Sequence, residues 1–125
     1  MPLAKVFRVT PQDDFLIIQP QEPICGCCDP NTNAELEALL GQLRDPSVRG
    51  VVLDMERLPY FGTYMLEAIY RLWQPIRSKG GKMVLCNVSV VGKQILRSVN
   101  FDKLWPIAPN IQEALQILQT QSPTA

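Results

Sequence analysis

The sequence predicts an α/β fold in which a mixed sheet of about four to five strands is flanked by four helices. Short apolar runs typical of buried strands alternate with stretches whose apolar residues recur at helical spacing. The predicted order is β-β-α-β-α-β-α-β-α, which implies parallel pairing of the later strands and helices over the sheet. A chain of 125 residues has room for one core. We therefore expect a single domain over 1–125, with its core at about 5–118 and a frayed tail at 119–125.

The first predicted elements are an antiparallel hairpin and a helix. Polar and apolar residues alternate over 5–9, which predicts a half-buried strand, and a continuous apolar run at 15–18 suits a more central strand. A turn is expected between them at 11–14, where proline and aspartate are typical turn residues. The first helix is expected to begin near Thr32, with Glu35 completing a capping box, and to end at an Asp-Pro pair.

The chain is organised around the stretch 50–65. An apolar run at 51–53 predicts a strand buried on both faces, and helical periodicity covers about 64–79. Between them lies a turn at 59–63 that ends on a residue suited to cap a helix. Pro75 is expected to kink that helix or to shorten its regular part. The loop at the carboxyl end of a central strand usually engages ligands and partners in open α/β sheets, so we expect the functional surface there.

The last third of the chain contains two further strands and two further helices. A buried strand is predicted at 83–86, and Ser89 is suited to cap the helix that follows it. Asn100 tolerates the left-handed conformation that often ends a helix. The segment 104–107 contains a proline and is therefore expected at a sheet edge. Asn110 is expected to cap the final helix.

The charge balance argues against several classes of function. Lys plus Arg (12) cancels Asp plus Glu (12), so no net field steers the chain toward nucleic acid or an anionic membrane. No apolar run approaches the roughly 18–20 residues of a membrane span, and the N-terminus lacks the pattern of a signal peptide. We therefore expect a cytoplasmic protein with no membrane span and no direct nucleic-acid contact.

The four cysteines are unevenly distributed. Cys25, Cys27 and Cys28 are clustered, but their C-x-C-C spacing is poor for metal binding and the chain has no histidine to assist. They are the candidates for a metal or thiol site, and the alternative is that they are incidental thiols. Cys86 lies in an apolar run and is expected to be a small buried core residue.

The residue types also argue against catalysis. Without histidine there is no Ser-His or Cys-His pair, and no Walker-type glycine loop is present. Asp54 and Glu56 could act as a carboxylate pair, but carboxylates at a strand end are more often solvated or paired, here with Arg57 or Lys82. We expect no enzyme activity and no cofactor.

Three segments carry a resemblance to a known family. The run 51–63 has a hydrophobic strand ending in aspartate, a connector, an aromatic residue and a helix start. The run 80–89 has Gly-Gly, a strand, then Asn, a hydrophobic residue and Ser, and 99–104 is similar with Asn100 in place of a glycine. Together with the element order, these segments resemble the STAS domain of bacterial anti-sigma factor antagonists over roughly residues 5–118. The resemblance implies a STAS-like fold and a non-enzymatic signalling domain in transcription regulation, with an anti-sigma factor kinase or related signalling protein as partner.

The loop and helix start at 60–66 depart from the family pattern. The family opens its helix with Asp-Ser-Ser-Gly-Leu, in which the partner kinase phosphorylates the serine after the aspartate. Here Gly62 stands in the place of the aspartate and Thr63 in that of the phosphorylated serine. Tyr64 and Met65 replace the second serine and the glycine. The resemblance therefore implies Thr63 as the phosphorylation candidate, whereas the residues alone are also consistent with a simple N-cap, and the two roles can coexist.

The same loop is the expected partner-binding surface, because aromatic and apolar side chains make rigid anchors. An alternative is that some of its members face the core, Phe61 or Tyr60 more readily than the others. Two other functions stay open, a constitutive adaptor that is not phosphorylated and a small-ligand, nucleotide-like binding module. The expected partner-binding residues are Tyr60, Phe61, Gly62, Thr63, Tyr64 and Met65.

Overall fold

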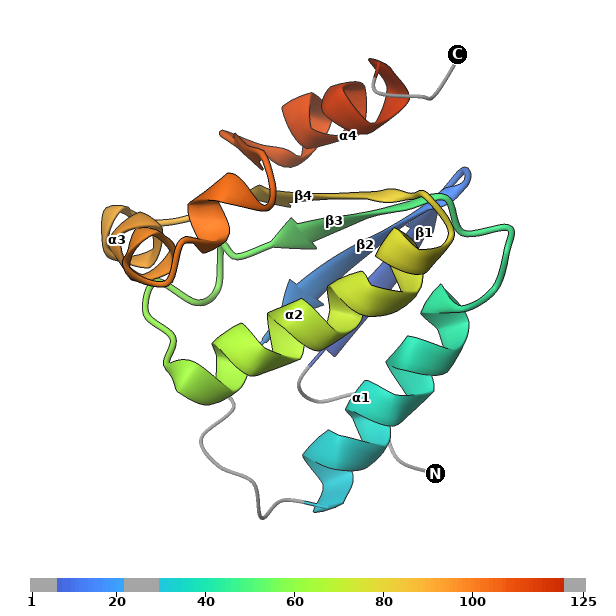
Figure 1. Ribbon diagram of the computed structural model, residues 1–125, viewed down its shortest axis with the longest axis horizontal. Helices are drawn as coiled ribbons and strands as arrows, with labels where there is room; N and C mark the ends of the chain where they lie inside the picture. The colour runs from blue at the N-terminus through green and yellow to red at the C-terminus, as the bar shows by residue number, and fades with distance from the viewer. Residues whose placement is uncertain (1–6, 22–29, 121–125) are drawn as a thin grey trace.

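The computed structural model describes residues 7–21 and 30–120, which form one five-stranded sheet with helices on both faces (Figure 1). The strands are β1 (Phe7–Gln12), β2 (Phe15–Pro20), β3 (Gly50–Asp54), β4 (Lys82–Cys86) and β5 (Ile107–Ala108). The helices are α1 (Pro30–Leu43), α2 (Thr63–Ser78), α3 (Val90–Ser98) and α4 (Ile111–Thr120), with a short 3-10 helix η1 (Phe101–Lys103) after α3. The predicted order of strands and helices is confirmed.

The sheet is mixed, as predicted. Its strand order is β1-β2-β3-β4-β5, with β1 antiparallel to β2 and every later pair parallel. Figure 1 shows α1 and α2 on one face of the sheet and α4 on the other, while α3 lies beyond the end of the strands. Parallel strands joined by helices bring all their carboxyl ends to one edge of the sheet, and the β3–α2 loop leaves from that edge.

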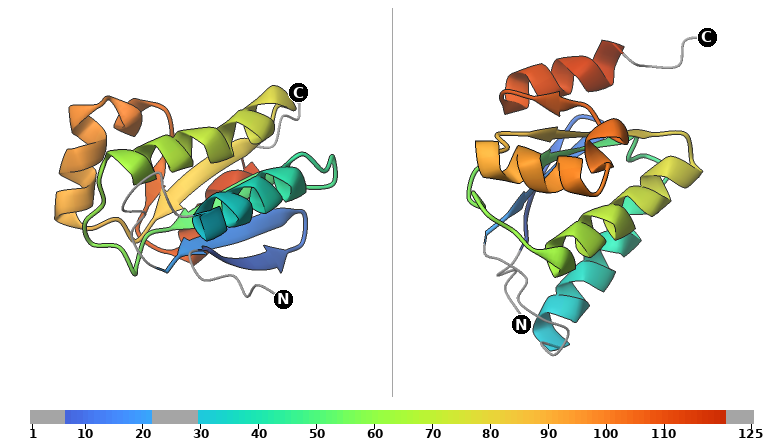
Figure 2. Two further views of the ribbon diagram at one scale, coloured as in Figure 1. Left: turned by 90° about the horizontal axis from the view of Figure 1, so that it is seen from below. Right: turned by 60° about the vertical axis from the view of Figure 1, so that its left-hand side comes forward.

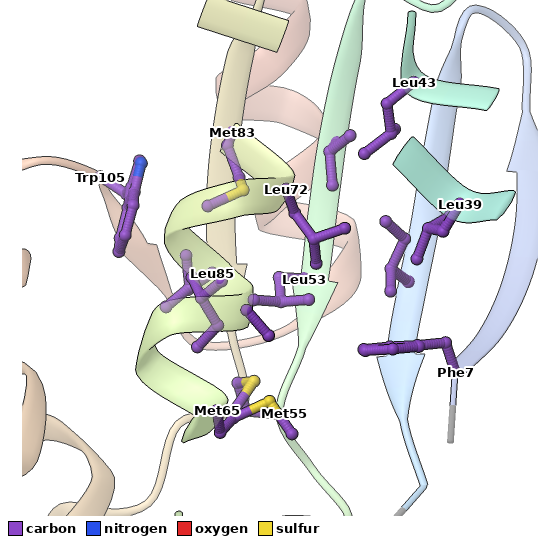
Figure 3. Packing of buried hydrophobic residues seen from close by; sticks show 14 of the residues in the cluster. Phe7, Leu39, Leu43, Leu53, Met55, Met65, Leu72, Met83, Leu85 and Trp105 are labelled. Carbon is purple, nitrogen blue, oxygen red and sulfur yellow. The ribbon is translucent and has the colours of Figure 1, made fainter. Parts of the chain in front are cut away.

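The central strands are buried on both faces because two separate apolar layers cover them. Val51 and Leu53 belong to the core under α1 and α2, whereas Val52 faces the smaller core under α4. Figure 3 shows Leu53 and Leu85 from the two central strands meeting Leu72 of α2. The prediction for Cys86 is confirmed, since its side chain is buried in the α4 layer.

The hairpin turn is tighter than predicted. β1 continues through Pro11 to Gln12, and the turn consists of Asp13 and Asp14 alone. Asp13 has a φ of 57°, a left-handed conformation that aspartate tolerates. Proline is compatible with β1 because this is an edge strand, where one side of the backbone needs no ladder partner.

Two helices differ from their predicted bounds. α1 begins at Pro30, which places Thr32 inside the helix rather than at its N-cap, and the Glu35 carboxylate accepts a hydrogen bond of 3.2 Å from the backbone N–H of Phe7. α2 continues through Pro75 to Ser78, so the proline does not shorten it. It ends in a Schellman motif in which the N–H of Gly81 donates to Ile76 O at 2.9 Å.

The C-terminal part of the structure confirms the predicted roles of Asn100 and Asn110 and corrects the bounds of the last strand and the last helix. Asn110 caps α4, because its side-chain oxygen accepts from the N–H of Glu113 at 2.9 Å. Asn100 has a φ of 63°, the predicted left-handed residue after α3. The edge strand is Ile107–Ala108 rather than 104–107. α4 extends to Thr120 and so includes two residues of the segment that was expected to fray.

Candidate functional site

The candidate site lies at the carboxyl edge of the sheet, where β3 and β4 end and the helices α2 and α3 begin. Figure 1 shows the loop from β3 passing beside α3 before it reaches the first turn of α2, and the left view of Figure 2 shows the starts of α2 and α3 at the same end of the molecule. This is the edge on which the sequence predicted the functional surface.

The β3–α2 loop is anchored at several points to its surroundings. The N–H of Met55 donates to Cys86 O at 3.0 Å, and Leu58 is buried. Further along, the Ser89 hydroxyl donates to Pro59 O at 2.6 Å while it accepts from the N–H of Gly92 at 2.9 Å. Ser89 therefore caps α3, as predicted, and also ties the loop to the start of that helix.

A close contact between Phe61 and Gly92 completes the anchoring. A Cβ atom at Gly92 would lie 3.1 Å from the Phe61 ring and 2.9 Å from a methyl group of Val88, so only glycine leaves room for this packing. Phe61 is only 1% exposed. The loop consequently reaches α2 along a path that the core determines.

A buried carboxylate stabilises the same edge and was not predicted. Asp54 is 2% exposed and accepts hydrogen bonds from Gln19 Nε2 at 2.9 Å, Asn87 Nδ2 at 3.0 Å and the backbone N–H of Glu56 at 3.0 Å. The expectation that it is solvated or paired with Arg57 or Lys82 is therefore wrong. These bonds connect the carboxyl ends of β2, β3 and β4, and they use Asp54 as a structural acceptor.

The surroundings of the thiol beside this network favour its protonated form. Burial, followed by the nearby charges of Asp54 and Glu56, raises the pKa of Cys86 to about 12, and only a thiolate is a strong nucleophile or metal ligand. No cluster of three or more metal-ligating side chains occurs within 7–21 and 30–120. Cys25, Cys27 and Cys28 lie outside the described residues, so their role as metal candidates stays a prediction.

Thr63 is the first residue of α2 and not its N-cap. Gly62 is the N-cap in an extended conformation, and it provides no side-chain cap. The Thr63 side chain is exposed and forms no hydrogen bond with any residue that the structure describes. The prediction of Thr63 as an N-cap is therefore wrong. Its hydroxyl lies in a first turn whose backbone N–H groups have no capping side chain and whose dipole favours negative charge.

The side chains of the predicted partner surface divide between the core and the exterior. Phe61 and Met65 are both 1% exposed, so the expectation that they contribute side chains to that surface is wrong. Tyr60 is 68% exposed and Tyr64 is 45% exposed. Met65 belongs to the apolar stripe of α2, and Phe61 fills the space beside Gly92.

Two further exposed apolar residues were not among the predicted site residues. Val90 and Val91 form the start of α3, and Val90 is 74% exposed. The hydrogen bond between Ser89 and Pro59 brings the residues that follow them, Val90 and Tyr60, close together in the structure. We refer to the four exposed side chains at this edge, which come from the β3–α2 loop and the starts of α2 and α3, as the apolar patch. Its members are Tyr60, Tyr64, Val90 and Val91.

No helix within 7–21 and 30–120 is both long and apolar enough to cross a membrane.

The comparisons with known proteins agree with the architecture. A sequence model of the STAS domain matches residues 7–114. The Bordetella bronchiseptica protein BtrV, provisionally named an anti-sigma factor antagonist, is 30% identical over 94 residues, which cover 74% of this chain and 81% of BtrV.

Solved structures show the same fold. A STAS domain protein from Planctomyces limnophilus, described as an anti-sigma factor antagonist, has a TM-score of 0.74 at 25% identity, over 90% of this chain and 97% of that one. The Thermotoga maritima protein TM1081 has a TM-score of 0.76 at 19% identity, over 90% and 94% of the two chains. The chain therefore belongs to the STAS domain family, in its anti-sigma factor antagonist branch.

Proposed function

We propose that this chain is a non-enzymatic, cytoplasmic signalling domain that docks a partner protein through the apolar patch at the carboxyl edge of its sheet. The partner is an anti-sigma factor kinase or a related signalling protein. The observation that carries the proposal is the exposure of Tyr60, Tyr64, Val90 and Val91 on a loop and a helix start that the core holds in place.

The physical argument rests on rigid anchors. Tyrosines supply large contact areas and a polar tip at a low cost in conformational entropy. The hydrogen bond from Ser89 to Pro59 O and the burial of Phe61 fix the loop before any partner arrives. Such pre-organisation reduces the ordering cost of binding.

Phosphorylation of Thr63 is the proposed means of regulation. The side chain is exposed, and it lies between Gly62 and Tyr64 within the docking surface. A phosphate would add about −1.5 to −2 charges beside Tyr64 and would oppose contact with an apolar or acidic partner. Glu67 lies four residues further along α2, so it would add a second negative charge on the same helical face.

A constitutive adaptor is the second candidate. It is favoured by Gly62, which stands where related loops carry an aspartate before the phosphorylated residue. In that case the apolar patch docks the same class of partner, and Thr63 has no regulatory role.

The test is an affinity pull-down from the native lysate, read by mass spectrometry, with the wild-type chain and three variants. Tyr60→Ala/Tyr64→Ala and Val90→Ser should both lose a kinase-like or sigma-pathway protein that the wild type retains. Val99→Ser is the matched control, because Val99 is an exposed valine at the opposite end of α3. Equal recovery by all four baits would show that the patch is not the docking surface.

The regulatory step is tested separately with Thr63→Glu and the control Thr10→Glu, which places the same charge on the exposed face of β1. Loss of the partner only with Thr63→Glu supports gating by phosphate. Equal recovery with both variants would leave docking intact and favour the constitutive adaptor.

A further inference from the structure

A second concave site lies away from the carboxyl edge. A pocket of about 390 Å³ opens between the C-terminal half of α2, the start of β4 and the segment 104–106. Two tryptophans, Trp73 and Trp105, contribute to its wall, and they pack edge to face with their ring centroids 5.5 Å apart. Its volume falls in the range of pockets that hold small organic molecules.

A buried donor distinguishes this pocket. Trp105 is 3% exposed, and its indole nitrogen Nε1 is buried without a hydrogen-bond partner among the described residues. Figure 3 shows this nitrogen at the end of the ring that lies level with Met83 rather than Leu85, toward the start of β4 where the pocket lies. An indole N–H can only donate, and a buried donor without an acceptor is costly. Since the nitrogen exposes less than 1 Å² of surface, a small movement of the ring would bring it to an acceptor seated in the pocket and satisfy it.

Two cations line the same pocket. Arg77 holds its guanidinium over the Trp73 ring, 5.0 Å from the centroid, which leaves the N–H edge of the guanidinium free to contact an anion. Lys82 is exposed at the start of β4. Neither forms an ion pair with any residue that the structure describes, and the described lining contains no carboxylate.

The short edge strand keeps the pocket open. β5 pairs with β4 only at Leu85 and Cys86, so among the described residues the beginning of β4 pairs with β3 on one side and with no strand on the other. The N–H of Leu85 donates toward β5, to Pro106 O at 3.0 Å. Because backbone groups alternate along a strand, the amide of Met83 faces the same side and borders the pocket.

A larger pocket on the other side of Gly80 and Gly81 lacks these features. Its volume is about 570 Å³, and Asp13 and Asp14 line it together with the basic residues. The ammonium of Lys79 in that pocket already donates to the backbone oxygens of Leu43 and Asp45. The two carboxylates offset part of the positive charge of this pocket, and the Lys79 ammonium already uses two of its donors.

We propose that the pocket at Trp73 and Trp105 binds a small organic carboxylate with an apolar or aromatic body. The body lies against the two indole rings, and the carboxylate accepts from Arg77, Lys82 and Trp105 Nε1. This site is separate from the docking surface, and it does not depend on the proposed function.

The two tryptophans make the test specific. They are the only tryptophans in the chain, so the two indole N–H signals in a ¹H–¹⁵N spectrum both report on this pocket. Titration with phenylacetate should move the Trp105 indole signal in a saturable way. Phenylacetamide, which has the same shape without the charge, should bind at least about tenfold more weakly.

Charge-removing variants provide the second arm. Arg77→Gln and Lys82→Gln change exposed side chains of the pocket, and Arg97→Gln is the matched control on α3, outside the lining. At least one pocket variant should weaken phenylacetate binding about tenfold, while the control retains wild-type affinity. The proposal is overturned if the indole signals do not move, if acid and amide bind alike, or if all the variants bind as the wild type does.

Discussion

The starts of α2 and α3 lie at the same edge of the sheet but use their hydroxyl residues differently. Ser89 directly precedes α3, where its side chain caps the helix and donates to Pro59 O. Thr63 lies inside the first turn of α2, after an N-cap glycine, and its hydroxyl is exposed. The Ser89 hydroxyl is therefore used in hydrogen bonds that stabilise the fold, whereas the Thr63 hydroxyl forms none with the described residues.

The two helix starts also depend on each other. Phe61, just before α2, packs against Gly92 in the first turn of α3, and the exposed side chains of the apolar patch come from the β3–α2 loop and from both helix starts. The position of these exposed side chains therefore depends on the buried contacts beneath them, such as the packing of Phe61 against Gly92, which we call the support. Substitutions in the support should change stability, whereas substitutions at the exposed positions should change binding alone.

The largest effect is expected from removing the side chain that joins the two helix starts. Phe61→Ala leaves a cavity beneath the loop and should lower the free energy of unfolding by about 3–5 kcal/mol. Tyr60→Ala, one residue away and exposed, should change it by no more than about 0.5 kcal/mol. Urea denaturation measures both. Similar values for the two variants would contradict the burial of Phe61.

A smaller loss is expected from the buried carboxylate. Asp54→Ala leaves the side-chain amides of Gln19 and Asn87 without their acceptor, which should cost about 2–3 kcal/mol. Glu56→Ala is the control, because this carboxylate is exposed two residues further along. If the control were as destabilised as Asp54→Ala in urea, the stabilisation would not come from the hydrogen-bond network.

The next smaller loss of stability is expected from removing the Ser89 hydroxyl, and the Thr63 hydroxyl provides the comparison. Ser89→Ala removes a helix cap and a hydrogen bond to the loop, and it should cost about 1–2 kcal/mol in urea denaturation. Thr63→Ala removes a hydroxyl without a partner among the described residues, so it should change stability by no more than about 0.5 kcal/mol. Equal losses would mean that Thr63 is also part of the structural support.

Much of the fold could be predicted from local patterns. The apolar runs at β3 and β4, the caps at Ser89 and Asn110 and the left-handed Asn100 each depend on a few neighbouring residues. Such features are encoded by short-range sterics and hydrogen bonding, and the element order follows from them.

The details of the site depend on contacts between distant segments, which local patterns do not contain. Gln19 and Asn87 reach Asp54 only because the strand register aligns three separate strand ends. Whether Gly62 or Thr63 caps α2 is decided by the path of the loop, which the packing of Phe61 against α3 sets. Met65 shares helical spacing with the buried residues Ile69 and Leu72 of α2, so the period of the sequence indicates its burial more reliably than its proximity to the loop does.

The smallest effect is expected from a negative charge at the free hydroxyl. In Thr63→Glu the helix dipole favours the carboxylate by about 0.3–1 kcal/mol, while Glu67 at the fourth position along opposes it by about 0.2–0.5 kcal/mol. The net change should lie between a loss of about 0.2 and a gain of about 0.8 kcal/mol, and it should shrink as salt screens both terms. Urea denaturation at low and high salt measures it, with Thr10→Glu as the control. A loss of stability above about 1 kcal/mol would contradict the absence of a capping side chain in the first turn of α2. If the change is small, a loss of partner binding by Thr63→Glu comes from the altered surface and not from unfolding.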